Sequence, residues 1–558
     1  MATTVTVSKT DNPEIDGLLG GTKWSGTITY SFPDSPSDYS ANYLGNGEST
    51  AAGFSAAPFA MQQAISYAFA LISSYTNAPI QFAGTNGADI AIAKSPAANP
   101  TSYAYYPASV PAGGDIWFGT AYDYSLAALG NYYFTIALHE LGHALGLKHS
   151  QETGGVANVA VPAAHDDLEY TVMSYRSYMG GPLTGYTNEA YGHPQTYMAN
   201  DILALQTLYG ANFTTHSENT VYSWNPATGH ELINGVAQLA PGNGAGGSAN
   251  RIFETIWDGN GIDTYDMSNY TTAVSINLNP GASSITSATQ LAYLGSGHYS
   301  AGNIYNAYLY DNDARSYIDN AIGGSGNDTL TGNAIANNFN GGGGNDTLTG
   351  GAGNDTIVGG SGTDVAVFSG AYTSYLIAYN SATQALTVTD QRSGSPDGTD
   401  TVVGVENFRF SDGTFAGSTF ISPPMVIESF GSTSLVAVGN NYFLDSNSTG
   451  SGDISSGPVS QHVASVIDDT FVFRPGVGAE VIENAVSTDT IALDRFSSVT
   501  HNAQLAALLN DAQTGQSQAL FQSANGGHDT VINLGNHDSI SLMDVHISDL
   551  HASNFIIR

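Results

Sequence analysis

Residues 139–149 read His139-Glu-Leu-Gly-His-Ala-Leu-Gly-Leu-Lys-His149, and this stretch decides the fold around it. On a helix, residues four apart lie on the same face, so His139 and His143 can both present ring nitrogens to one cation. Glu140 would lie beside that cation. Gly146 lets a helix end through a left-handed conformation, after which the chain can turn back and add His149 as a third ligand.

Three neutral imidazoles leave one coordination position open, which is typical of a catalytic zinc ion rather than a structural one. Zinc lowers the pKa of a bound water to about 7, and a neighbouring carboxylate can take the proton as the water attacks a carbonyl. The pattern therefore predicts one catalytic Zn²⁺ with Glu140 as general base. The alternative is a set of ordinary core histidines, but three histidines and a glutamate are costly to bury without a metal.

The composition restricts the partners. Among 558 residues there are 48 acidic and 12 basic side chains, a formal net charge of −36, and no cysteine. Nucleic acids and anionic membranes require a basic surface, so neither is an expected partner. Disulfides and cysteine metal sites are excluded. No apolar run is long enough to span a membrane, and the first residues lack the apolar core of a signal peptide.

A downstream turn extends the pattern around residues 139–149. In Thr171-Val-Met173-Ser-Tyr175, Met173 lies 24 residues after His149. Together the two stretches resemble the metzincin metallopeptidases. By that resemblance Met173 forms the hydrophobic floor of the zinc site, and Tyr175 is a zinc ligand at rest that moves to stabilise the oxyanion.

The absence of cysteine selects the branch within the metzincins. Astacins use disulfides and matrixins use a propeptide cysteine, whereas serralysins need neither. The segments 114–119, 194–202 and 209–212 are also similar to serralysin catalytic domains. Ser150 departs from the pattern, because many serralysins have proline after the third histidine.

A nine-residue repeat begins at Gly323, Gly332, Gly341, Gly350 and Gly359. A flexible linker would have no reason to keep an acidic and an apolar residue in fixed register. The repeat resembles the calcium-binding RTX motif, in which turns around Ca²⁺ alternate with short strands of a parallel β-roll. Glycine permits the turn conformations, and aspartate and carbonyl oxygens are the ligands that calcium prefers.

The resemblance implies several structural calcium ions. The predicted calcium-site residues are Asp258, Asp263, Asp266, Gly323, Gly324, Gly326, Asp328, Gly341, Gly342, Gly344, Asp346, Gly350, Gly351, Gly353, Asp355, Gly359, Gly360, Gly362 and Asp364. Alternate repeats share cations, so Asp328, Asp346 and Asp364 are expected on one side of the roll. Asn337 and Asp355 are expected on the other, where the uncharged Asn337 predicts weaker binding.

Residues 88–93 have the alternation of a strand. In metzincins the edge strand above the cleft pairs with an extended substrate, and the sequence predicts that Ala88, Ile90, Ala91, Ile92 and Ala93 form it. Pairing through the backbone accepts many peptide sequences. The alternative is an ordinary sheet edge.

The expected fold is multidomain α+β. It comprises a short propeptide (1–15), a zincin-type zinc metallopeptidase domain (16–213), a crossing segment (214–250), an RTX β-roll (251–420) and a β-rich C-terminal module with a secretion signal (421–558). The expected function is a monomeric, secreted, calcium-dependent endopeptidase acting on polypeptide substrates, exported by a type I secretion apparatus of a Gram-negative bacterium. The alternative is a non-enzymatic RTX adhesin or surface-layer protein on a zincin scaffold.

Overall fold

The computed structural model describes residues 2–43, 45–380 and 382–421, followed by segments 435–438, 441–444, 460–463, 470–473, 479–483, 490–493, 502–514, 520–524, 528–535, 538–542 and 545–557. By their internal contacts the residues form two units. The first comprises 1–377 and 384–415, and the second comprises 378–383 and 416–558. Among the described residues, no helix combines the length and apolar character needed to cross a bilayer.

The N-terminal part of the first unit combines helices with a six-stranded sheet. The helices are α1 (Pro13–Asp16), α2 (Phe59–Tyr75), α3 (Tyr132–Leu145) and α4 (Ala199–Tyr209). The sheet has the order β5-β3-β6-β8-β7, formed by β3 (Ile28–Ser31), β5 (Ile80–Phe82), β6 (Ile90–Lys94), β7 (Ser102–Ala104) and β8 (Ile116–Phe118). The short β4 (Ser55–Ala56) pairs with β6, and β1 (Thr3–Thr6) pairs with β2 (Thr22–Ser25). Strand β7 is antiparallel to β8 and ends the sheet.

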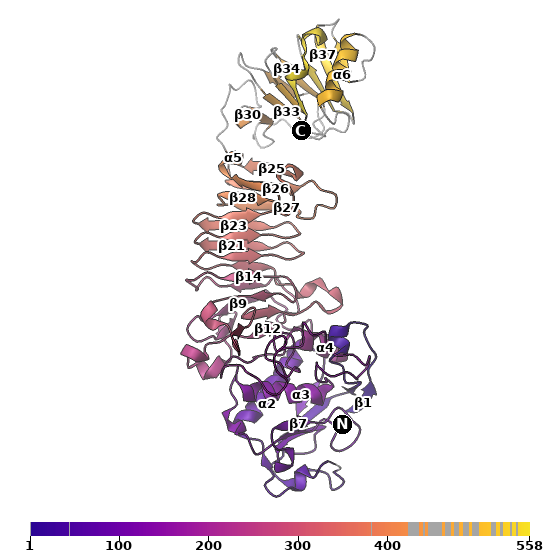
Figure 1. The fold of residues 1–558 in the computed structure, drawn as a ribbon, viewed down its shortest axis with the longest axis vertical. Coiled ribbons are helices and arrows are strands. Elements are labelled where there is room, and N and C mark those ends of the chain that lie inside the picture. The colour runs from indigo at the N-terminus through magenta and orange to yellow at the C-terminus, as the bar shows by residue number, and fades with distance from the viewer. Residues whose placement is uncertain are drawn as a thin grey trace. The chain divides into compact units, whose positions relative to one another are not determined.

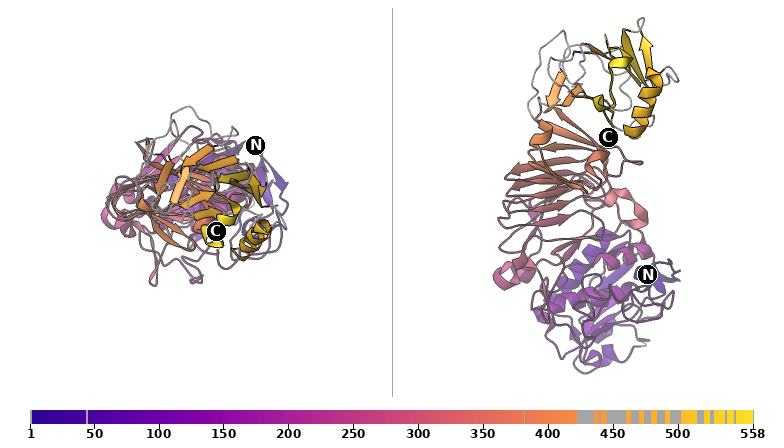
Figure 2. Two further views of the ribbon diagram at one scale, coloured as in Figure 1. Left: turned by 90° about the horizontal axis from the view of Figure 1, so that it is seen from above. Right: turned by 45° about the horizontal axis from the view of Figure 1, so that its top comes forward.

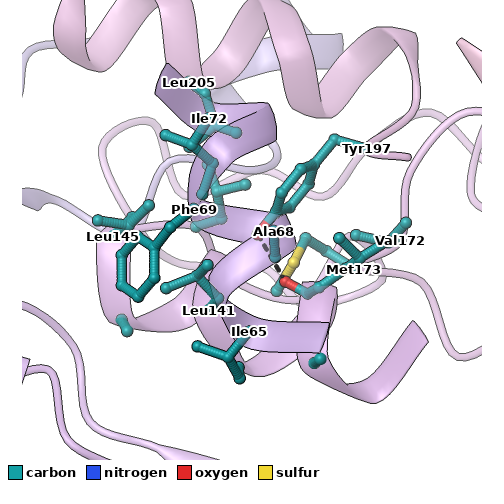
Figure 3. Packing of buried hydrophobic residues seen from close by; sticks show 14 of the residues in the cluster. Ile65, Ala68, Phe69, Ile72, Leu141, Leu145, Val172, Met173, Tyr197 and Leu205 are labelled. Carbon is teal, nitrogen blue, oxygen red and sulfur yellow. Dashed lines mark hydrogen bonds between the residues drawn. The ribbon is translucent and has the colours of Figure 1, made fainter. Parts of the chain in front are cut away.

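Helix α3 packs against α2 through a fully buried apolar face (Figure 1). In Figure 3, Leu141 and Leu145 of α3 lie close to Ile65 and Phe69 of α2. The helix begins at Asn131, whose side chain accepts the amide of Phe134. It ends at Gly146, which has the left-handed φ of 112° expected of a residue that turns the chain out of a helix.

The repeats contribute parallel strands to two sheets, and consecutive repeat strands alternate between these sheets (Figures 1 and 2). One contains β11 (Val236–Ala237), β10 (Glu231–Ile233), β9 (Val221–Trp224), β13 (Thr264–Asp266), β19 (Asn320–Ile322), β21 (Asn338–Gly343), β23 (Thr356–Ser361), β27 (Thr399–Val403) and β26 (Ala385–Asp390) in that order, while β25 (Tyr375–Asn380) spans the limit of the unit. The other has the order β14 (Ser275–Asn277), β20 (Thr329–Thr331), β22 (Thr347–Thr349), β24 (Val365–Val367), β28 (Asn407–Phe410) and β29 (Gly413–Ala416).

Each repeat advances the roll by one strand, and strands two repeats apart are neighbours. Leu330 pairs with Leu348, and Phe339 pairs with Ile357. These apolar side chains are buried between the sheets. The segment 214–250, expected as a crossing that can contain strands, includes β9 to β11, and β9 pairs directly with β13.

A smaller sheet joins the two parts of the first unit. It consists of β12 (Glu254–Ile256), β18 (Ile304–Asn306) and β15 (Ser283–Ser284), and the hairpin of β16 (Tyr293–Gly295) and β17 (His298–Tyr299) lies close to it in sequence. Phe253, Trp257 and Tyr305 belong to the same buried cluster as the residues of α2 and α3. The N-terminal part and this smaller sheet therefore share one hydrophobic core.

Within its described residues, the second unit contains two five-stranded sheets and two α-helices. Their elements are α5 (Ser418–Ile421), β30 (Leu435–Val438), β31 (Asn441–Leu444), β33 (Thr470–Phe473), β35 (Thr490–Leu493), β39 (Phe555–Ile557), β32 (Ser460–Val463), β34 (Ala479–Glu483), β38 (Asp538–Leu542), β37 (Asp529–Gly535), β36 (Phe521–Ala524) and α6 (Asn502–Gln513). Most of 422–501 within the predicted module 421–558 lies outside the described residues.

Candidate metal centre and active site

The three histidines of residues 139–149 converge at the end of α3. The Nε2 atom of His143 lies 3.2 Å from Nε2 of His139 and 3.0 Å from Nε2 of His149. Among the described residues, these three side chains form the one group of three or more histidine or carboxylate ligands that are close enough to hold a metal ion together.

The opposite ring nitrogen of each histidine has an acceptor. Nδ1 of His139 donates to the carbonyl of Val172 at 2.8 Å, and Nδ1 of His143 donates to the carbonyl of Leu147 at 2.7 Å. Nδ1 of His149 donates to the carboxylate of Glu152 at 2.8 Å. These bonds place the proton on Nδ1, so that all three Nε2 atoms present lone pairs to one point.

This donor set fits zinc. Tetrahedral bonds of 2.0–2.1 Å place ligand nitrogens about 3.3 Å apart, close to the distances between these Nε2 atoms. Three lone pairs facing one another repel unless a cation lies between them. Burial and the neighbouring His149 lower the pKa of His139 to about 3, and burial likewise holds the pKa of His143 well below its usual value. His139 and His143 are therefore neutral, as metal ligands must be.

Glu140 is buried beside the histidines. Its Oε1 accepts a hydrogen bond of 2.7 Å from the hydroxyl of Ser102, and its buried Oε2 has no hydrogen-bond partner within the described part of the chain. Burial raises the pKa of Glu140 to about 7. One carboxylate oxygen is thus fixed and the other is free to exchange a proton.

Met173 lies beneath α3, beside Tyr197 (Figure 3). A Cβ atom at Gly142 would approach the Met173 sulfur to 2.6 Å, so the glycine inside the HELGH stretch makes room for this side chain. The hydroxyl of Tyr175 is 2.7 Å from Nε2 of His149, and burial raises the pKa of Tyr175 to about 12. The predicted zinc-site residues are therefore brought together.

The predicted substrate strand is an interior strand, so that prediction is wrong. Ile90 and Ala91 pair with β3, Ala93 pairs with both β8 and β4, and no edge of β6 is free. The edge strand beside α3 is β7, and its Ser102 donates the hydrogen bond to Glu140. On the other face of the sheet, the hydroxyls of Tyr103 and Tyr105 both donate to the buried carboxylate of Glu48.

The repeat aspartates form two ladders along the roll. Oδ1 of Asp346 accepts the amide of Asp328, and Oδ1 of Asp364 accepts the amide of Asp346, each at 2.8 Å. On the other side, Oδ1 of Asp355 accepts the amide of Asn337 at 2.7 Å. The Oδ2 atoms of Asp346, Asp355 and Asp364 are buried with no hydrogen-bond partner within the described part of the chain. Such oxygens are suited to cation ligation.

The predicted glycines lie at the turns between ladder residues. Gly342, Gly344, Gly351, Gly353, Gly360 and Gly362 have positive φ, while Gly323, Gly324, Gly326, Gly341, Gly350 and Gly359 do not. A Cβ on Gly362 would clash with the carbonyl oxygen of Gly344 in the adjacent turn. The glycines are thus required both by conformation and by the close stacking of turns.

The upstream acidic group differs in part from expectation. Asp258 and Asp263 lie together with Asp319, and burial raises the pKa of Asp258 to about 7 and that of Asp263 to about 8. Asp266 instead accepts the amide of Ser268. Sequence reasoning missed Asp319. Its Oδ2 accepts a hydrogen bond of 2.8 Å from the amide of Asp263.

The ladders continue past the contiguous repeats. Oδ1 of Asp400 accepts the amide of Asp355, and Oε2 of Glu406 accepts the amide of Asp364, each at 2.8 Å. Sequence reasoning missed both residues because 30 residues separate Val367 from Gly398. The spacing Gly398-Thr-Asp400-Thr-Val402 keeps the glycine, aspartate and apolar positions of a repeat. This pattern predicts a further repeat turn at Asp400.

Comparisons with known proteins agree with both sites. A family model described as "Matrixin" matches residues 24–169, and one described as "RTX calcium-binding nonapeptide repeat (4 copies)" matches residues 313–334 and 331–366. Serralysin B of Dickeya chrysanthemi is 31% identical over 349 residues, covering 58% of this chain and 63% of the relative. The chain is thus similar to serralysins, and residues 313–366 match RTX repeats.

Two further relatives match over shorter stretches of the chain. Metalloprotease AprA of Pseudomonas entomophila (strain L48) is 32% identical, covering 42% of this chain and 45% of the relative. A serralysin C of Dickeya chrysanthemi is 33% identical, covering 41% and 42%. The chain thus spans 42% to 63% of the length of these serralysins. The solved lipase LipA of Serratia marcescens aligns at a TM-score of 0.17 and 14% identity over 48% of this chain and 47% of the lipase, too distant to inform the fold.

Proposed function

We propose that this chain is a secreted zinc endopeptidase that hydrolyses peptide bonds in extended polypeptides. The observation that carries the proposal is the convergence of three Nε2 atoms, 3.0–3.2 Å apart along His139–His143–His149, beside a buried carboxylate with one free oxygen. His139, His143 and His149 would hold the zinc, with Tyr175 as a further ligand at rest. When bound, zinc polarises the scissile carbonyl and acidifies a water molecule.

Glu140 acts as general base and then as general acid. Its free Oε2 takes a proton from the attacking water and returns it to the leaving amine, while the bond from Ser102 to Oε1 holds the carboxylate in place. The Tyr175 hydroxyl is neutral at physiological pH because its pKa is raised, so it can donate a hydrogen bond to the oxyanion.

The substrate would extend along β7 rather than β6. The carbonyl of Thr101 accepts the amide of Gly119, and the amide of Tyr105 donates to the carbonyl of Asp115, next to the two ends of β8. In an antiparallel pair these groups alternate, so the backbone groups of Ser102 and Ala104 point toward the open edge. A peptide paired there lies directly beside Glu140. Backbone pairing would give broad sequence tolerance.

Calcium would stabilise the roll. Pairs of adjacent turns would bind Ca²⁺ through Asp328, Asp346, Asp364 and Glu406 on one side and through Asp355 and Asp400 on the other. The proposed architecture is a zincin domain, a calcium-binding parallel β-roll and a β-rich module. Since alternate turns place unpartnered carboxylate oxygens next to one another, the folded roll should be much less stable without the cation. Export through a type I apparatus and a monomeric state are part of the same proposal.

A casein digest tests the peptidase function. Purified full chain in millimolar calcium should cleave casein, and a zinc chelator should abolish cleavage until zinc is restored. Glu140→Gln removes the base while keeping the size of the side chain, and should lower kcat/KM by at least 10²-fold. The matched control is Glu218→Gln, at an exposed glutamate far from the site in sequence, which should retain full activity.

The same digest separates the peptidase from the alternative of an adhesin or surface-layer protein. A wild-type chain that binds zinc but leaves casein and unfolded substrates intact would support the non-enzymatic alternative. Equal cleavage by wild type and Glu140→Gln would exclude the assigned base.

A further inference from the structure

The carboxylate of Asp166 connects two segments of the zinc site. Its Oδ1 accepts hydrogen bonds from the hydroxyl of Ser150 at 2.6 Å and from the hydroxyl of Ser174 at 2.8 Å. Its Oδ2 accepts a hydrogen bond of 3.1 Å from Nε of Arg176. We name these four residues the Asp166 bridge.

The bridge is withdrawn from solvent. Ser150 and Ser174 are completely buried, and Asp166 is 5% exposed. Hydrogen bonds to an ionised acceptor are shorter and stronger than neutral ones, and a buried carboxylate that lost a donor would be left undersatisfied. The three donors therefore fix the positions of the serines with respect to each other.

Each serine adjoins a residue of the metal centre. Ser150 directly follows His149, and Ser174 lies between Met173 and Tyr175. The amide of Ser150 also donates to the carbonyl of Met173 at 3.3 Å. His149 and Tyr175 approach to 2.7 Å although 26 residues separate them, and the bridge is a direct side-chain link between their two segments.

We propose that Asp166 is a positioning residue that holds His149 and Tyr175 in a common geometry around the metal. This inference rests on the proposed zinc function, but it concerns metal binding and not the chemical step. Ser150 replaces the proline that many serralysins have at this place, and its hydroxyl supplies one of the two arms. Asp166 itself does not touch the reacting atoms.

The test compares zinc affinity in Ser150→Ala, Ser174→Ala and the double variant, measured by competition with a chelator. Loss of an outer partner of a metal ligand typically weakens metal binding 10- to 100-fold, and each single variant should fall in this range. Both serine hydroxyls donate to the same carboxylate oxygen, so removing the second should cost much less zinc affinity than removing the first. The fold loss of zinc affinity in the double variant should therefore be well below the product of the two single losses. The visible spectrum of the Co²⁺-substituted protein should shift in all three.

Ser31→Ala is the matched control, since Ser31 is a buried serine of the same domain whose hydroxyl has no hydrogen-bond partner in the described structure. It should leave zinc affinity and the Co²⁺ spectrum unchanged. Thermal unfolding of the zinc-free variants checks the fold separately. Unchanged zinc affinity in both single variants, or a double variant equal to their product, would overturn the proposal. Both readouts remain valid if the wild type proves to have no peptidase activity.

Discussion

At the scale of single residues, the metal centre depends on what lies behind each ligand. Backbone carbonyls of Val172 and Leu147 orient the two histidines of α3, whereas His149 depends on the side chain of Glu152. Backbone acceptors cannot be removed by mutation, but Glu152 can. His149 is therefore the ligand whose orientation is most open to change.

Glu152→Gln should weaken zinc binding about 10-fold, because an amide oxygen accepts the Nδ1 proton less strongly than a carboxylate and makes Nε2 less basic. The measurement is the zinc dissociation constant of the full chain. Glu14→Gln is the control, since Glu14 accepts from Nδ1 of His165 in the same way but away from the metal centre. Equal effects of the two substitutions would show that Glu152 has no specific role.

The convergence of the three histidines could be predicted from the sequence, because helical spacing alone brings His139 and His143 together and Gly146 reverses the chain for His149. Ser102 and Asp166 could not, because they reach the site from separate segments through the tertiary fold. Ser102 comes from β7, 38 residues before Glu140. No local spacing connects such residues to the motif.

At the scale of elements, alternation identified β6 as a strand but could not tell an interior strand from an edge. Both have the same side-chain pattern, since neighbours are decided by sheet order. The repeat was more informative, because its period fixes both the strand and its partner two units later. Prediction stopped at Val367, where the hairpin of β25 and β26 interrupts a period that Asp400 resumes.

The turn around Asn337 is built differently from its neighbours. The side-chain amide of Asn337 donates to the carbonyl of Asp319 at 2.8 Å and to Oδ1 of Asn333 at 3.1 Å. The amide hydrogens thus satisfy oxygens that a cation would otherwise ligate. This gives a physical reason for the predicted weaker calcium binding on that side.

Asn337→Asp should make this turn dependent on calcium. The substitution removes two donors and adds a charge, so the calcium-free roll should unfold at a lower temperature while the calcium concentration at the folding midpoint decreases. Calcium titration followed by far-ultraviolet circular dichroism measures both. Asn338→Asp adds the same charge at an exposed neighbour and should change neither markedly. Increased stability of Asn337→Asp without calcium would contradict this account.

At the scale of the whole molecule, the net charge of −36 comes from an excess of acidic side chains. Some of these carboxylates are buried in the roll, and burial raises their pKa. Burial raises the pKa of Asp346 and of Asp355 to about 6 in the folded chain, against about 3.9 for an unfolded aspartate. A raised pKa in an acid favours folding while the group is protonated. This contribution is complete below about pH 4 and is lost as the pH rises through 6.

Without calcium, the roll should therefore be less stable at pH 7.5 than at pH 5. With calcium the sign reverses, because the cation binds only the ionised carboxylates, and its affinity should rise over the same interval. Thermal unfolding of the full chain in a calcium chelator and in millimolar calcium, at both pH values, tests the two signs. Asp346→Asn should reduce both dependences. A calcium-free chain that is equally stable at both pH values would refute this assignment.

The core that Phe253, Trp257 and Tyr305 share with helices α2 and α3 has a consequence for the producing cell. If the chain is a calcium-stabilised peptidase, as proposed, a core shared with the smaller sheet that precedes the repeats would form less readily where calcium is scarce. We expect the cytoplasm to be protected from digestion by the order of folding itself, so that no separate inhibitor is needed while the chain is still inside.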